Sequence, residues 1–130
     1  MVQQVRIEPG QVRKEAAIQT SACVCHFYIM NTEEKYMRAA LKEADKARKI
    51  DEVPVGAVVV RDGKIIARAH NMREHNNQAM AHAEMLAIRQ AAAFLGGWRL
   101  TGCTMFVTAE PCSMCAGAIV WSRISKLYIG

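Results

Sequence analysis

Two cysteines are the side chains in this sequence whose spacing is best suited to chemistry. Cys112 and Cys115 stand three positions apart, directly after Pro111. On a helix this spacing brings both sulfur atoms to one face, and the free N–H groups of the first turn favour thiolate over thiol. By itself, a Cys-x-x-Cys pair fits a redox dithiol, half of a structural zinc site or part of a catalytic zinc site.

His82 and Glu84 form a second group near the start of another predicted helix. Alone, such a pair is more typical of a solvated helix start. Combined with Cys112 and Cys115, however, His82 completes three nitrogen and sulfur ligands, the open geometry of a catalytic zinc site whose fourth position holds water. A structural site would need a fourth protein ligand, and the remaining candidates have no recognisable spacing: His26, His70, His75 and Cys103.

The elements that must position these residues begin with an amphipathic helix. Apolar residues recur at three-to-four spacing over residues 32–50, which is typical of a helix with one buried face. Strands at 53–60 and 64–69 should pair antiparallel, because Asp62-Gly63 between them suits a two-residue hairpin turn. A polar loop then leads into a helix at about 82–95, which ends at Gly96-Gly97.

The second half of the chain alternates strand and helix. It has a strand at 103–108, a helix at about 112–122 and a strand at 126–129. Such a quick succession implies a parallel right-handed crossover. The pattern therefore predicts an α/β fold in which helices pack on a mixed sheet. Cys103 falls in one of these strands, and we interpret it as a core cysteine.

Composition limits the class of protein. A chain of 130 residues has room for one domain, and 52% hydrophobic with 22% charged residues is ordinary for a soluble globular protein. The net charge of +5 suits an acidic partner such as RNA without requiring one. An odd number of cysteines, five, without a recognisable secretion signal fits a reduced compartment, so we expect a cytoplasmic protein.

The first 30 residues lack a sustained apolar period, and Pro9-Gly10 interrupts them early. We expect residues 1–30 to be a disordered N-terminal tail outside a domain formed by residues 31–130. A second interpretation is that Met30 is the true start, because Thr32 with Glu33 and Glu34 provides a cap and an acidic first turn for a helix. The sequence leaves both interpretations open.

The order His82-Ala83-Glu84 and then Pro111-Cys112-x-x-Cys115 resembles the signature of the zinc-dependent cytidine and deoxycytidylate deaminase superfamily. Within it, the chain resembles the tRNA-specific adenosine deaminases, which convert the wobble adenosine to inosine. The resemblance runs from about residue 31 to residue 130. The segments that carry it are residues 53–58, Asn71 and residues 81–84, 110–118 and 122–124.

The resemblance implies a three-layer α/β/α fold with one zinc ion per chain, held by His82, Cys112 and Cys115. Glu84 would shuttle protons while a zinc-activated hydroxide attacks the adenine ring. Asn71 would hydrogen-bond the base, and Val55 would line its site. The expected partners are a tRNA anticodon stem-loop and a second copy of the chain in a homodimer.

The family normally continues past the segment that matches residues 127–130, with another strand and further helices. We therefore expect the fold here to lack its last strand and helices, which would leave Leu127 and Ile129 at an uncovered sheet edge. Two alternatives share every metal-binding residue. One is a deaminase of free guanine or cytosine, and the other is a zinc-binding fragment without activity.

Overall fold

The structure, a computed structural model, describes residues 3–6 and 32–130. Residues 7–31, and with them most of the expected tail, Met30 and His26, lie outside the described residues. The helices are α1 (Thr32–Lys49), α2 (Ala83–Leu95) and α3 (Ser113–Trp121), and the strands are β1 (Gln3–Arg6), β2 (Gly56–Arg61), β3 (Lys64–His70), β4 (Thr104–Val107) and β5 (Lys126–Ile129).

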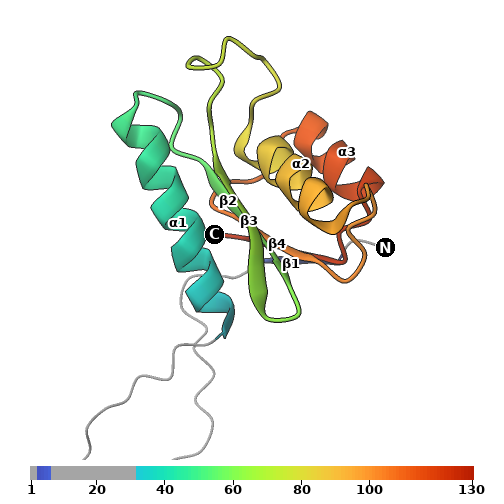
Figure 1. Ribbon diagram of the computed structural model, residues 1–130. Coiled ribbons are helices and arrows are strands. Elements are labelled where there is room, and N and C mark those ends of the chain that lie inside the picture. Colours follow the sequence, from blue (N-terminus) through green and yellow to red (C-terminus); the bar gives the residue numbers. More distant parts are fainter. Residues whose placement is uncertain (1–2, 7–31) are drawn as a thin grey trace, which may run out of the picture.

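The described elements form three layers around one mixed sheet. The strand order is β1-β5-β4-β2-β3; β2 is antiparallel to both of its neighbours, whereas β4, β5 and β1 run parallel. Helix α1 lies on one face, and α2 and α3 lie on the other (Figure 1). The expected α/β/α fold is confirmed, as is the parallel pairing of the strands on either side of α3.

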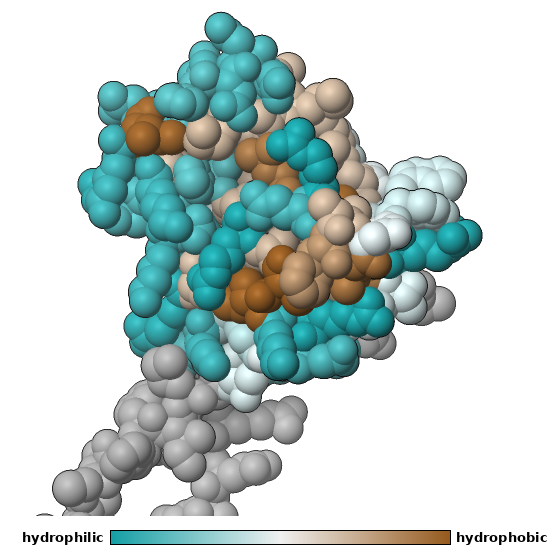
Figure 2. All heavy atoms as spheres, viewed as in Figure 1, coloured by the Kyte–Doolittle hydropathy of each residue, from teal (hydrophilic) through white to brown (hydrophobic). Residues whose placement is uncertain are grey.

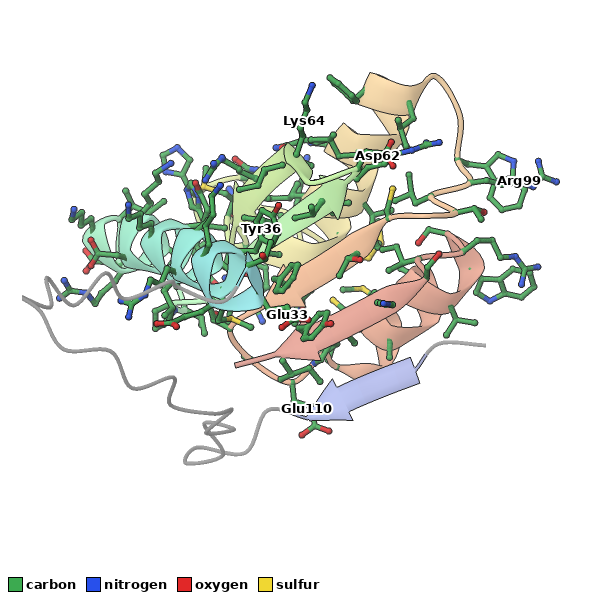
Figure 3. The ribbon with its side chains drawn as sticks, turned by 90° about the horizontal axis from the view of Figure 1, so that it is seen from below. Glu33, Tyr36, Asp62, Lys64, Arg99 and Glu110 are labelled. Atoms are coloured by element: carbon green, nitrogen blue, oxygen red, sulfur yellow. The ribbon has the colours of Figure 1, made fainter. Side chains whose placement is uncertain are left out.

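The β2–β3 hairpin has the turn that its sequence predicts. Asp62 and Gly63 adopt φ angles of 50° and 73°, the positive values that a tight two-residue hairpin needs at both positions. Tyr36 donates a hydrogen bond from Oη to the carbonyl oxygen of Gly63 at 2.7 Å, so α1 holds the turn. Figure 3 shows Glu33 and Tyr36 at the start of α1, beside the strands.

Gly56 sets how closely β2 approaches α1. A Cβ atom at this position would lie 2.1 Å from the carbonyl oxygen of Ala40 and 2.4 Å from the amide nitrogen of Ala44. Helix and strand therefore touch backbone to backbone, which only glycine permits. Farther along the same face, the rings of Phe106 and Tyr128 stack with centroids 4.7 Å apart.

The opposite face holds the larger core. Alanines along α2 meet the sheet beneath that helix, and Ile119 of α3 joins the same buried cluster. Cys103 is fully buried in this cluster, as expected for a core cysteine. The small alanine side chains let α2 lie close to the strands, which fixes the position of its first residues.

Strand β1 corrects two expectations about the ends of the chain. The sequence predicts no element within residues 1–30, yet Gln3–Arg6 pairs parallel with β5, placing Gln4 opposite Leu127 and Arg6 opposite Ile129. The expectation that Leu127 and Ile129 lie at an uncovered sheet edge is therefore wrong. Strand pairing satisfies backbone N–H and C=O groups and needs no apolar period, so a search for periodicity misses it.

No helix in the described ranges is both long and apolar enough to cross a membrane.

Candidate metal centre

Two helix starts bring the predicted metal ligands together. His82 is the N-cap of α2 and Cys112 is the N-cap of α3, so each helix begins one position later than the sequence predicts. Their carbonyl oxygens accept the first helical hydrogen bonds, from the amides of Leu86 and Ala116. Neither side chain caps its own helix, so the imidazole and the thiol stay available for a ligand.

The distances within this group fit a zinc ion. His82 Nδ1 lies 3.5 Å from Cys115 Sγ and 3.7 Å from Cys112 Sγ. With usual zinc bond lengths, tetrahedral geometry separates a nitrogen ligand from a sulfur ligand by about 3.6 Å. Within the described ranges, this is the one group of three or more potential ligands whose donor atoms all lie within 4.8 Å of one another.

The surroundings of Cys115 oppose a negative charge on its sulfur atom. Burial raises the pKa of the Cys115 thiol, and the neighbouring Glu84 carboxylate and Cys112 raise it further. At Cys115 this outweighs the preference for thiolate that the helix start suggested from sequence. A cation held by the group would offset this effect, because a positive charge beside the sulfur stabilises the thiolate.

Glu84 is buried on the first turn of α2, in electrostatic and hydrogen-bonding reach of Cys115. It is not a member of the three-ligand group. Glu110, the other acid close in sequence to the cysteines, is exposed and points outward (Figure 3). Glu84 thus lies beside the three candidate ligands without joining their group.

The other candidate ligands lie elsewhere. His70 Nδ1 is 3.2 Å from Glu43 Oε2 on α1, and Cys103 is enclosed in the core. His75 is exposed in the loop after β3, and His26 falls outside the described residues. The described group therefore has three protein ligands, which leaves one tetrahedral position for a non-protein ligand, as in catalytic zinc sites.

Asn71 and Val55 lie next to each other, and the residue after Asn71 contacts the residue before His82. The backbone amide of Asn71 donates to the carbonyl oxygen of Val55 at 3.0 Å. The backbone amide of Met72 donates to the carbonyl oxygen of Ala81, the residue before His82, also at 3.0 Å. Asn71 is buried, and Val55 is half-buried against the larger core. Two backbone bonds thus connect the predicted base-binding residues to the start of α2.

Glu52 is a residue that the sequence analysis missed. Its buried carboxylate accepts hydrogen bonds from Asn71 Nδ2 at 2.9 Å and from the backbone amide of His75 at 2.8 Å. An acid at the end of a charged helix looks like an ordinary solvated residue in sequence. Its position just before the segment 53–58 was the one available signal.

Comparison with known proteins places the chain among zinc-binding deaminases. Residues 30–130 match the family described as the cytidine and deoxycytidylate deaminase zinc-binding region. The chain is 56% identical over 101 residues to the tRNA-specific adenosine deaminase of Bacillus subtilis, covering 78% of this chain and 63% of the relative. It is 50% identical over 103 residues to the Streptococcus pyogenes enzyme of the same name, covering 79% and 65%. The chain thus spans slightly less than two thirds of these relatives' length.

Two solved structures give the same picture of the fold. A structure from a study of A-to-I editing by tRNA:A34 deaminases at the wobble position is 50% identical, with a TM-score of 0.72 and coverage of 74% of each chain. A guanine deaminase from Bacillus subtilis is 38% identical, with a TM-score of 0.73 and coverage of 75% of this chain and 62% of that one. The backbone therefore resembles deaminases of two substrate classes to the same degree, and sequence identity separates them.

Proposed function

Because the chain belongs to the cytidine and deoxycytidylate deaminase zinc-binding family, we propose that it catalyses hydrolytic deamination of the wobble adenosine of tRNA to inosine. The observation that carries this proposal is the His82, Cys112 and Cys115 group with Glu84 beside it. The tRNA substrate is supported by 50 to 56% identity with tRNA-specific adenosine deaminases, against 38% with the guanine deaminase.

In this proposal His82, Cys112 and Cys115 hold one zinc ion. When bound, zinc acts as a Lewis acid that makes a water molecule nucleophilic at neutral pH. The open fourth position of the ligand set is suited to that role, and the helix starts that carry His82 and Cys112 hold the two ligands rigidly.

Glu84 is the proposed proton carrier. Its carboxylate takes a proton from the attacking water and delivers it to the purine ring nitrogen. A second transfer, to the exocyclic amine, lets the C–N bond break, so adenosine and water become inosine and ammonia. Burial beside Cys115 keeps Glu84 within reach of both partners and away from competing solvent.

The proposed substrate is the anticodon stem-loop of a tRNA. A deaminase must receive its base outside the helical stack, and an anticodon loop presents unstacked bases at little cost. Asn71 would hydrogen-bond the base and Val55 would contact it, both next to the start of α2. The net charge of +5 favours association with the phosphate backbone.

We also propose a cytoplasmic homodimer, the assembly that the resemblance implies. Large apolar side chains stay exposed near the end of α2 and on α3: Phe94 (68%), Trp98 (53%), Val120 (50%) and Trp121 (72%). Figure 2 shows apolar side chains exposed among polar ones on the face where Figure 1 draws the hairpin and α2. Apolar surface of this kind is typical of protein interfaces.

The test is deamination by the zinc-loaded chain of an anticodon stem-loop, free guanine and free cytosine in parallel, with ammonia release measured for each and inosine for the RNA. Inosine formation abolished by Glu84→Ala would support the proposal. Turnover of guanine or cytosine alone would favour the free-base alternative. A chain that binds zinc and turns over none of the three would be the inactive fragment.

A further inference from the structure

Glu52 makes contacts that the proposed mechanism does not yet use. Asn71 Nδ2 donates to Glu52 Oε2 at 2.9 Å, and the backbone amide of His75 donates to Oε1 at 2.8 Å. Glu52 and Asn71 are both buried. The Glu52 carboxylate therefore connects the chain before β2 to the end of β3 and to the loop that leads to His82.

The hydrogen bond to Glu52 decides which end of the Asn71 side-chain amide faces Glu52 and which end faces away. A side-chain amide has a donor end and an acceptor end of nearly the same shape, so its neighbours decide its orientation. An ionised carboxylate accepts hydrogen bonds and cannot donate them, so Glu52 binds the NH₂ group and repels the oxygen. Asn71 Oδ1 must then lie on the side away from Glu52.

The oxygen end of Asn71 stays available for a ligand. Within the described residues, no fully buried side-chain nitrogen or oxygen lacks a hydrogen-bond partner, and the bond to Glu52 is the one hydrogen bond that the Asn71 side chain makes there. Oδ1 therefore keeps contact with solvent although its residue is buried. An acceptor in this position can bind an N–H group of a base and cannot bind a ring nitrogen lone pair.

We propose that Glu52 is a positioning residue that orients the Asn71 amide so that its oxygen accepts a hydrogen bond from an N–H group of the substrate base. The inference rests on the proposed function, in which Asn71 contacts the base. Adenine carries such N–H groups on its exocyclic amine, at the carbon where the reaction takes place. Glu52 would thus set the hydrogen-bonding pattern that the site offers without touching the base.

Glu52→Gln tests the orientation with almost no change in shape. The backbone amide of His75 requires the Gln oxygen, so the Gln NH₂ faces Asn71 and forces its amide to turn over. Asn71 then presents NH₂ to the base. We expect zinc content to be unchanged and kcat/KM for the stem-loop to fall about 10- to 100-fold. Glu74→Gln is the matched control, because Glu74 is an exposed acid of the same loop, and it should stay within twofold of wild type.

A second substitution should restore the orientation. Asn71→Asp alone places two carboxylates against each other and should reduce activity. When it is combined with Glu52→Gln, the new carboxylate accepts from the Gln NH₂ with one oxygen and presents the other to the base, as the wild-type amide does. We expect the double variant to be at least tenfold more active than the product of the single effects predicts. Simple additivity, or a Glu52→Gln variant within twofold of wild type, would overturn the inference.

An NMR measurement reads the orientation without activity. In ¹H–¹⁵N spectra, the side-chain amide of Asn71, identified by its loss in Asn71→Asp, should show one proton shifted downfield by the Glu52 carboxylate, and Glu52→Gln should move it. An Asn71 signal that is identical in wild type and Glu52→Gln would contradict the inference. If wild type fails to deaminate the stem-loop, the proposed function fails, and this spectrum still decides the role of Glu52.

Discussion

The imidazole Nδ1 of His82 lies 3.5 Å from the sulfur of Cys115, although 33 positions separate the two residues in the chain. Each stands at the start of a helix on the same face of the sheet. The distance depends on how α2 and α3 pack against each other and against the strands. Neither residue belongs to a strand, so we expect removal of one ligand to test the site while the sheet stays intact.

Cys115→Ser should lose zinc while the domain stays folded. Serine keeps the size of the side chain but replaces the soft thiolate with a hydroxyl, a poor zinc ligand. We expect zinc content, measured by elemental analysis after purification without chelators, to fall from about one per chain to near zero. Cys103→Ser is the control, because Cys103 is buried outside the ligand group. Full zinc occupancy in Cys115→Ser would refute the ligand assignment.

Glu84→Gln should keep zinc and lose deamination. The amide fills the same space beside Cys115 but cannot carry a proton, so we expect kcat to fall about 10²- to 10⁴-fold. Elemental analysis and inosine formation would be measured on the same preparation. Glu110→Gln, at an exposed neighbouring acid, should leave both values near wild type. Loss of zinc in Glu84→Gln would make Glu84 a ligand instead.

The sequence could predict the features of the fold and of the site that depend on residues close together in the chain. The Asp62-Gly63 turn and the placement of Cys112 and Cys115 at a helix start depend on a few neighbouring residues, and the structure has both. The Glu52 contact to Asn71 and the β1–β5 pairing join segments that are distant in the chain. No short-range pattern records such contacts, because they depend on how whole elements pack.

Gly56→Ala should destabilise the fold. The added methyl would meet the backbone of α1, 2.1 Å from the carbonyl oxygen of Ala40, and backbone cannot move aside as a flexible side chain can. We expect a loss of at least about 1–3 kcal/mol in the free energy of unfolding, measured by urea denaturation. Gly97→Ala is the control, since a Cβ there meets no atom within 4 Å. Equal stability of the two variants would show that α1 can shift away from β2.

Glu43 should make the fold sensitive to acid. Burial alone would raise the pKa of Glu43, but hydrogen bonds from Lys46 and His70 and their charges outweigh it and hold the pKa below its ordinary value of 4.5. A carboxyl whose pKa is depressed by folding stabilises the folded state above the unfolded pKa, and this stability is lost as pH falls through the folded pKa.

The comparison of wild type with Glu43→Gln isolates this effect. We expect Glu43→Gln to be less stable than wild type between pH 5 and 7, and the difference in unfolding free energy to shrink as pH falls below about 4.5. Urea denaturation at several pH values across this range measures the unfolding free energy of both proteins. A difference that stays constant with pH would mean that Glu43 contributes by packing and not by its charge.

Strand β1 covers the outer edge of β5. Gln3–Arg6 pairs with Lys126–Ile129 through backbone hydrogen bonds, so removal of residues 1–6 should expose unpaired N–H and C=O groups of β5. Exposed strand edges pair with other chains. We expect the deletion to raise the fraction of self-associated protein in analytical ultracentrifugation. We also expect faster amide hydrogen exchange at Leu127 or Ile129, which pair with β1.

A pair of proline variants separates loss of pairing from loss of chain length. Successive N–H groups of a strand point to opposite sides, so only one of Gln4→Pro and Val5→Pro removes a hydrogen bond to β5. That variant should associate like the deletion, while the other should behave more like wild type. If the deletion and both proline variants match wild type in exchange and in association, β1 does not protect the edge of β5.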